Sequence, residues 1–251
     1  MRKIIIMMLA FVAVIYAAGF IYGVIAYKND PFKRISSIEV QQALAADNHA
    51  DTTPAAPENT KPAKTQGAKI PAAAVPDRVL GNPKAPVAIV EYASLTCPHC
   101  AHFHKEILPE IKKNYVDTGL VKLIFRPFPF DGIALKGSIM AYCLPEAQFY
   151  PFIDAIYSSQ EEWVRGNNPE AELKKIARLA GLTEEKYKEC SGEKSALNKQ
   201  ILETRMKAEK ELGISSTPTF LIGGEKIEGA KPFEEFKAVL DNQLKQGKVQ
   251  K

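Results

Sequence analysis

Apolar positions between residues 87 and 128 follow a strand-like pattern, then a helical one, then a strand-like one again. Residues 87–93 are apolar at nearly every position, which is typical of a strand buried on both faces of a sheet. A helix is predicted over about residues 97–117 by apolar side chains that recur on one face: Phe103, Ile107, Ile111 and Tyr115. Pro109 lies inside this helix and is expected to kink it. Residues 121–128 predict a second strand.

From about residue 133 to residue 212 the pattern is helical throughout, with short breaks. Two short strands are then predicted, over residues 219–222 and 225–227. They flank Gly223 and Gly224, a pair typical of a two-residue hairpin turn. A final amphipathic helix is predicted from apolar positions on one face: Phe233, Phe236, Val239, Leu240 and Leu244. The order is strand–helix–strand, helical block, hairpin and helix, which predicts an α/β domain.

The first 76 residues differ in character from the rest of the chain. Residues 4–27 form an uncharged apolar run of 24 residues, long enough to cross a bilayer as a helix. We therefore predict a membrane anchor within residues 1–30. A cleaved signal peptide, processed at Ala17-Ala18-Gly19, is the alternative. Either segment would carry the rest of the chain out of the cytosol.

Residues 31–76 are rich in proline and alanine and poor in large apolar side chains. Such a segment cannot bury enough surface to offset the entropy lost on ordering, so we expect an extended linker. The apolar positions between residues 35 and 44 are interpreted as a juxtamembrane segment, with a short dimerisation helix as the alternative. The globular domain is expected over residues 77–251, with the helical block at about 133–212 as an insertion.

Composition and charge narrow the function. The net charge is +4, with 46% hydrophobic and 25% charged residues, which is ordinary for a soluble domain. No basic stretch is interleaved with aromatic residues, so we expect no nucleic-acid partner. All four cysteines lie beyond residue 90. Disulfide chemistry suits an oxidising compartment, so the globular domain is expected outside the cytosol.

The chemistry of the chain is concentrated in Cys97-Pro98-His99-Cys100, between the first strand and the first helix. Two thiols separated by two residues can make and break one short disulfide. A helix N-terminus carries partial positive charge and favours a thiolate, so Cys97 is predicted to be the nucleophile. Cys100 lies one turn inward and is predicted to be the resolving thiol. The His99 ring is expected to stabilise the Cys97 anion.

Two other roles for this cysteine pair compete with the redox role. Zinc needs four ligands, and no second CxxC or paired Cys/His motif completes such a set. An inert structural disulfide is the other alternative. We therefore expect no metal and no cofactor.

Three parts of the sequence carry a family resemblance. The segment EYASLTCPHC at residues 91–100, the TPTF segment at 217–220 and the helical block between them resemble the DsbA family of the thioredoxin-fold superfamily. The resemblance covers roughly residues 76–244. It implies a thioredoxin fold with an inserted helical domain. It also implies a periplasmic oxidase that donates its disulfide to folding exported proteins with free thiols, and that a quinone-linked membrane partner reoxidises.

The resemblance also gives roles to residues outside the cysteine pair. Glu91 is implied to be a proton acceptor near Cys100; the alternative is an acid at the edge of the core, paired with a lysine such as Lys122. Thr217 and Pro218 are implied to form a cis-proline loop beside the sulfurs, where an extended substrate segment would add hydrogen bonds. A trans proline that opens a strand is the alternative.

Cys143 and Cys190 flank much of the helical block. In an oxidising compartment we expect them to form a structural disulfide, and two free buried thiols or a second redox relay are the alternatives. His102 and His104 are interpreted as solvated polar residues of the helix, with a tuning or substrate-contact role as the alternative.

A set of aromatic residues is interpreted as core, with a substrate groove as the alternative: Trp163, Phe128, Phe130, Tyr142 and Phe149.

These features together predict a monomeric thiol:disulfide oxidoreductase that introduces disulfide bonds into exported proteins. It would work in the bacterial periplasm, held at the inner membrane by residues 4–27. A disulfide isomerase or reductase on the same fold is the first alternative. A non-catalytic peptide-binding module of the same fold is the second.

Overall fold

A computed structural model describes residues 70, 72–192 and 195–249. The predicted anchor, almost all of the predicted linker and the 35–44 stretch lie outside the described residues. Within them, no helix combines the length and the apolar character needed to span a bilayer. The chain joins the domain slightly before residue 77, because Val75 is buried and its backbone N–H donates to Thr204 Oγ1 at 3.3 Å.

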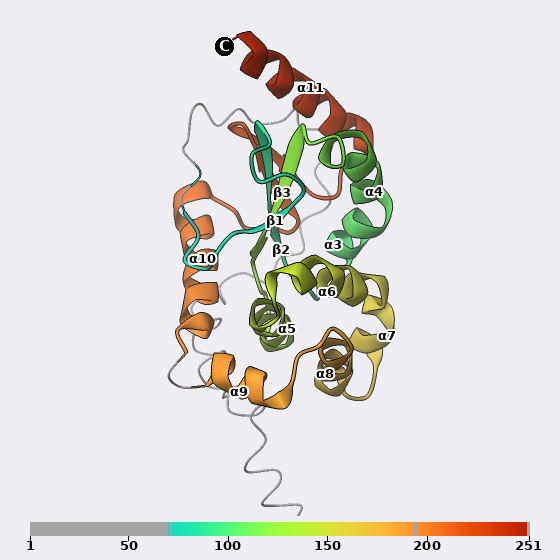
Figure 1. Cartoon of the computed structure of the whole chain (residues 1–251), viewed down its shortest axis with the longest axis vertical. Coiled ribbons are helices and arrows are strands. Elements are labelled where there is room, and N and C mark those ends of the chain that lie inside the picture. Colours follow the sequence, from blue (N-terminus) through green and yellow to red (C-terminus); the bar gives the residue numbers. More distant parts are fainter. Residues whose placement is uncertain (1–69, 71, 193–194, 250–251) are drawn as a thin grey trace, which may run out of the picture.

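A five-stranded mixed sheet forms the centre of the molecule, in the order β1-β3-β2-β4-β5 (Figure 1). β2 and β3 run parallel, and the other neighbouring strands are antiparallel. The strands are β1 (Arg78–Leu80), β2 (Val87–Ala93), β3 (Val121–Pro127), β4 (Thr219–Ile222) and β5 (Glu225–Glu228). The predicted strands agree with these bounds to within one residue. β1 was not predicted, because three residues are too few to show a periodic pattern.

β2 occupies the middle of the sheet, as its apolar run predicted. Its residues are buried except for Ala88, which is half-buried. Glu91 lies opposite Phe125 of β3 on one side and Phe220 of β4 on the other. The only acid in the predicted strand therefore lies in the centre of the sheet, six residues before Cys97.

The helix that follows β2 is built from four consecutive segments: α3 (Pro98–His102), the π-helical turn η2 (Phe103–Ile107), α4 (Leu108–Ile111) and the π-helical turn η3 (Lys112–Val116). Pro109 has no N–H and cannot bond to the preceding turn. The turn before it is widened, and the Leu108 N–H bonds to the Phe103 carbonyl five residues back. The disturbance predicted at Pro109 is therefore a π-helical turn.

The helical insertion lies between β3 and β4, and most of it forms a group of helices at one end of the sheet (Figure 1). Its helices are α5 (Gly132–Cys143), α6 (Glu146–Ser158), α7 (Gln160–Arg165), α8 (Pro169–Leu179), α9 (Glu184–Ser191) and α10 (Leu197–Leu212). The last of them, α10, returns along the sheet. A C-terminal helix, α11 (Phe233–Val249), completes the domain.

Two apolar clusters hold the helices against the sheet. The larger one joins the helix that follows β2, and also α11, to one face of the sheet. It does so through Phe103, Phe220 and Phe236, whose rings lie 4.4 to 5.5 Å apart. The smaller one joins α10 to the other face, through Ala208 and residues of the central strands. The helix that follows β2 is thus fixed along its length by core packing.

The aromatic residues for which the sequence left a choice between core and substrate groove belong mostly to the core, as interpreted. Trp163, Phe128, Tyr142 and Phe149 are buried, whereas Phe130 is 42% exposed. The Phe130 ring packs edge-on against Phe128 at 5.4 Å.

A disulfide joins Cys143, at the end of α5, to Cys190 in α9. This is the pairing expected from the sequence. The bond closes a loop within the insertion and links two helices that also pack against each other.

Replacing both cysteines, Cys143→Ala and Cys190→Ala, should lower the free energy of unfolding by about 4 kcal/mol, since the bond closes a loop of 47 residues in the unfolded chain. Urea denaturation of the variant and of the wild-type protein measures the difference. A loss below about 1 kcal/mol would show that the bond constrains the unfolded chain little.

Candidate active site

The turn between β2 and α3 is held in place by the helical insertion. The Tyr157 hydroxyl donates to the Ser94 carbonyl at 3.1 Å, and the Gln160 side-chain amide donates to the carbonyls of Leu95 and Cys97 at 2.8 and 3.0 Å. Both donors are buried. Sequence analysis did not identify Tyr157 or Gln160, because nothing local in α6 or α7 signals a contact with a turn more than 60 residues away.

A second link fixes the same turn from the start of α5. The Thr96 hydroxyl donates to Asp131 Oδ2 at 2.6 Å, while Asp131 Oδ1 accepts from the Ala134 backbone N–H at 2.7 Å. Asp131 is thus the N-cap of α5 and an anchor for the residue just before Cys97. The cap could have been found from the sequence, but its link to Thr96 could not.

Cys97 stands at the N-cap of α3 with extended backbone, and its side chain makes no capping hydrogen bond. It is partly exposed, whereas Cys100 is buried, and both are free thiols. A hydrogen bond from the Cys100 thiol, with help from the Thr217 side chain and the backbone N–H groups of Cys100 and His99, lowers the pKa of Cys97 to about 5 in spite of its partial burial. Cys97 is therefore a thiolate at neutral pH.

Cys100 has the opposite character. Its burial raises the pKa of the thiol well above 9.0, and the hydrogen bond to Cys97 and the negative charges of Cys97 and Glu91 raise it further. Of the two sulfurs, the accessible one is the anion and the buried one keeps its proton.

His99 acts on Cys97 through its backbone N–H. The residue itself is exposed, as is Pro98. The backbone N–H of His99 is thus one of the helix N-terminal groups that lower the pKa of Cys97, and the predicted role of its ring stays a prediction.

The Thr217–Pro218 peptide bond is cis, as the resemblance implied. In the structure the Cys97 thiol donates to the Thr217 carbonyl oxygen, with 3.3 Å between sulfur and oxygen. The Thr217 hydroxyl is buried and has no hydrogen-bond partner of its own among the described residues. It is thus available to donate to the Cys97 sulfur once that sulfur is an anion, which is how it lowers the pKa of Cys97.

Glu91 is fully buried, and it pairs with a histidine and not with a lysine. His104 Nε2 lies 3.1 Å from both carboxylate oxygens. Lys122, the lysine considered from the sequence, instead donates to the Pro83 carbonyl at 2.7 Å.

The interpretation of His104 as a solvated residue was wrong, because its side chain is almost completely buried. His102 is exposed, as interpreted. A signal for the burial of His104 existed: it lies four residues after Cys100, which places it on the inward face of the helix.

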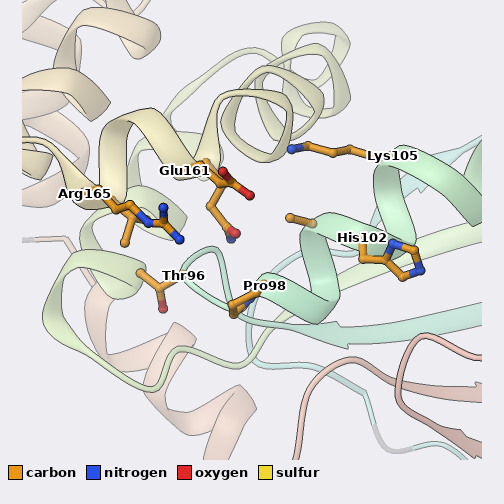
Figure 2. A pocket seen from close by; sticks show the side chains of 9 residues that line it. Thr96, Pro98, His102, Lys105, Glu161 and Arg165 are labelled. Atoms are coloured by element: carbon orange, nitrogen blue, oxygen red, sulfur yellow. The ribbon is translucent and has the colours of Figure 1, made fainter.

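A pocket of about 260 Å³ lies beside the turn, where α3 and η2 face α7 (Figure 2). Its wall is part apolar, from Pro98 and Val164, and part charged. Figure 2 shows the side chains of Lys105 and Arg165 extending toward it from opposite sides, with Glu161 between them. No motif in the sequence pointed to it, since one wall belongs to the insertion.

The part of the chain that the structure describes contains no group of three or more metal-ligating side chains.

Known proteins resemble this chain. A family model described as thioredoxin matches residues 73–242. A Rickettsia prowazekii protein, provisionally named a protein-disulfide oxidoreductase, is 36% identical over 175 residues; the match covers 67% of this chain but only 63% of that protein. Disulfide bond formation protein D of Bacillus subtilis is 28% identical and is covered over 77% of its length, with 66% of this chain. The crystal structure of Wolbachia pipientis α-DsbA1 has 33% identity and a TM-score of 0.64, over 69% of this chain and 94% of that one.

Removing the Thr217 hydroxyl tests the account of the Cys97 anion. In the reduced protein the ultraviolet absorbance of the thiolate should titrate near pH 5. In Thr217→Val the midpoint should rise by about one pH unit, because a hydrogen bond to a charged group is lost. Thr217→Ser keeps the hydroxyl and serves as the matched control. An unchanged midpoint in Thr217→Val would remove Thr217 from the account.

The lowered pKa of Cys97 also makes the stability of the folded, reduced protein depend on pH. The pKa of Cys97 is lower in the folded state than its ordinary value of 9.0, so the thiolate stabilises the folded, reduced protein fully above pH 9.0. That contribution declines as the pH falls and is lost as the pH passes through about 5.

Proposed function

The chain belongs to the DsbA-like family of thioredoxin-fold proteins, and on this basis we propose that it is a thiol:disulfide oxidoreductase that oxidises cysteines in exported proteins. The substrates would be unfolded or folding polypeptides with free thiols. The proposal rests on the chemistry of the site and does not require a cofactor.

The observation that carries the proposal is the difference between the two thiols. Cys97 is partly exposed, with its pKa lowered to about 5, while Cys100 is buried and its pKa is raised. Stabilising one thiolate stabilises the reduced pair, and a stable reduced pair makes the corresponding disulfide a stronger oxidant. The geometry thus favours an enzyme that donates its disulfide to a substrate.

The proposed reaction begins with the oxidised enzyme. A substrate thiolate attacks Cys97 in the Cys97–Cys100 disulfide, and a mixed disulfide forms between Cys97 and the substrate. Cys100 leaves as a thiolate and takes up a proton. A second substrate thiolate then attacks the substrate sulfur of the mixed disulfide, which leaves an oxidised substrate and a reduced enzyme whose stable anion is Cys97.

Glu91 is proposed as the group that manages the proton of Cys100. Its carboxylate is fully buried, and it is close enough that its charge raises the pKa of Cys100. A buried acid next to a buried thiol can accept the proton when Cys100 must become nucleophilic, and return it when Cys100 leaves.

The loop at Thr217 and Pro218 is proposed to hold the substrate backbone. The Thr217 carbonyl lies 3.3 Å from the Cys97 sulfur, so a chain lying along this loop would bring its own sulfur to Cys97. Such a chain would bind through main-chain hydrogen bonds, which are available to any sequence, as a general oxidase requires.

The partner and location are part of the same proposal. Each turnover leaves a dithiol, so a quinone-linked membrane oxidase that takes two electrons would complete the cycle. The enzyme would act in the bacterial periplasm as a monomer, tethered to the inner membrane by residues 4–27.

Single cysteine variants should separate the two roles. Cys97→Ser should abolish oxidation of a reduced peptide with two cysteines, because the attacked sulfur is gone. Cys100→Ser should instead accumulate a mixed disulfide through Cys97, detectable by mass spectrometry under non-reducing conditions. Adducts on Cys100 in the Cys97→Ser protein, at the rate seen for Cys97, would reverse the assignment.

Equilibration with glutathione should distinguish an oxidase from a reductase or an isomerase. The Cys97–Cys100 couple is expected to have a reduction potential above about −180 mV, more oxidising than that of protein disulfide isomerase. Refolding of a scrambled disulfide protein should be accelerated little in the same buffer. A potential below about −270 mV would favour a reductase, and rapid unscrambling would favour an isomerase.

A further inference from the structure

A buried ion pair joins the helix that carries Cys100 to the central strand, and its histidine lies four residues after Cys100 on the same buried face. Glu91 of β2 has no exposed surface, and His104 in η2 is almost fully buried. His104 Nε2 lies 3.1 Å from each oxygen of the carboxylate. Well-packed apolar residues would serve stability as well as or better than a buried ion pair, so this one calls for a functional reason.

The other ring nitrogen of His104 faces a carboxylate at the protein surface. Nδ1 lies 3.9 Å from Asp154 Oδ1 in α6, and the Asp154 side chain is 64% exposed. The ring of Tyr157, from the same helix, stacks on the imidazole with 4.4 Å between ring centroids. His104 therefore lies between an acid deep in the core, at hydrogen-bond distance, and an acid at the surface, at a longer ion-pair distance with no hydrogen bond to Nδ1. Aromatic packing fixes the plane of its ring.

The charge of His104 follows from what surrounds it. Burial by itself would lower its pKa, but Glu91 and Asp154 outweigh burial and raise the pKa of His104 to about 9. The other titratable groups that interact with this cluster are Tyr157, Tyr150 and Cys100, and burial raises the pKa of all three, so they stay neutral. Below about pH 9 the ring is thus an imidazolium between two acids.

We propose that His104, bridging Glu91 and Asp154, is a positioning residue that keeps the Glu91 carboxylate charged beside Cys100, so that Glu91 can take the Cys100 proton each time the disulfide is remade. The inference rests on the proposed oxidoreductase function and assigns a part of its reoxidation step. Burying a carboxylate without a partner is strongly unfavourable, and the imidazole of His104 supplies that partner.

The step that depends on this arrangement is the closing of the Cys97–Cys100 bond. A disulfide of the oxidant is first attacked by the Cys97 thiolate, and a mixed disulfide forms while one oxidant thiolate leaves. The S–H bond of Cys100 then breaks, an O–H bond forms on Glu91, and the Cys100 sulfur attacks Cys97. The bond between Cys97 and the oxidant breaks, and its electron pair leaves on the oxidant sulfur. The enzyme loses two electrons, the oxidant disulfide becomes two thiolates, and the proton of Cys100 passes from Glu91 to solvent, which restores the Glu91 carboxylate.

Oxidised glutathione as the oxidant separates the two halves of this reaction. The reduced full chain, purified in detergent, is mixed with oxidised glutathione, quenched with acid and analysed by mass spectrometry for reduced, glutathione-bound and oxidised protein. In His104→Gln the first half, attack by Cys97, should stay within about twofold of wild type. The second half should slow at least about 10-fold at neutral pH and depend more steeply on pH.

Three further variants show whether charge is the cause. His104→Lys restores a cation opposite Glu91 and should recover most of the rate. Asp154→Asn should slow the second half by about two- to threefold, since the lost acid is largely exposed. Asp117→Asn removes an exposed acid that pairs with Lys112 and should change nothing.

The outcomes separate this inference from the proposed function. If wild-type protein forms no disulfide with glutathione, the proposed function itself fails. If wild type reacts but His104→Gln and Asp154→Asn close the bond at the wild-type rate with the wild-type pH dependence, the role of His104 is overturned. Should His104→Gln fail to fold, Asp154→Asn decides alone: a wild-type rate overturns the inference and a slower second half supports it.

Discussion

The site depends on one hydrogen bond, from the buried thiol of Cys100 to the sulfur of Cys97. This contact is the largest influence that lowers the pKa of Cys97, and the same contact helps to raise the pKa of Cys100. The Cys100 sulfur thus keeps its proton, and the Cys97 sulfur carries the negative charge. The helix N-terminus and the Thr217 loop strengthen a difference that the pair already creates, because each supplies a donor to the same anion.

That hydrogen bond needs a rigid frame, and the helical insertion supplies much of it. The sheet ends at Ala93, and the next four residues lead into α3 with few backbone partners of their own. Gln160, Tyr157 and Asp131 provide the missing contacts from three points in the insertion. The insertion therefore does more than enlarge the molecule. It fixes the carbonyl of the reactive cysteine and the residues just before it, which a thioredoxin-fold sheet and helix alone would leave less constrained.

The interior behind the cysteines combines apolar packing with a small set of charges. Glu91 lies in the middle of the sheet, where an isolated charge would be strongly unfavourable, and His104 offsets it from the helix that also carries Cys100. Because strand and helix each contribute one partner, the ion pair also ties the orientation of the active-site helix to the sheet. The same ion pair thus offsets a buried charge and positions the helix that carries Cys100.

The sequence by itself determined the features that depend on residues close together in the chain. Continuous apolarity predicted β2 as the central strand, the Gly223-Gly224 pair predicted the hairpin, and Cys97 to Cys100 at a strand–helix junction predicted the chemistry. Only the tertiary structure decided that Glu91 pairs with His104 and not with Lys122, and that Gln160 reaches the reactive turn. The reason is physical: periodicity shows which face of an element is buried, but not which element covers it. Charges and side-chain amides choose partners only after the helices have packed.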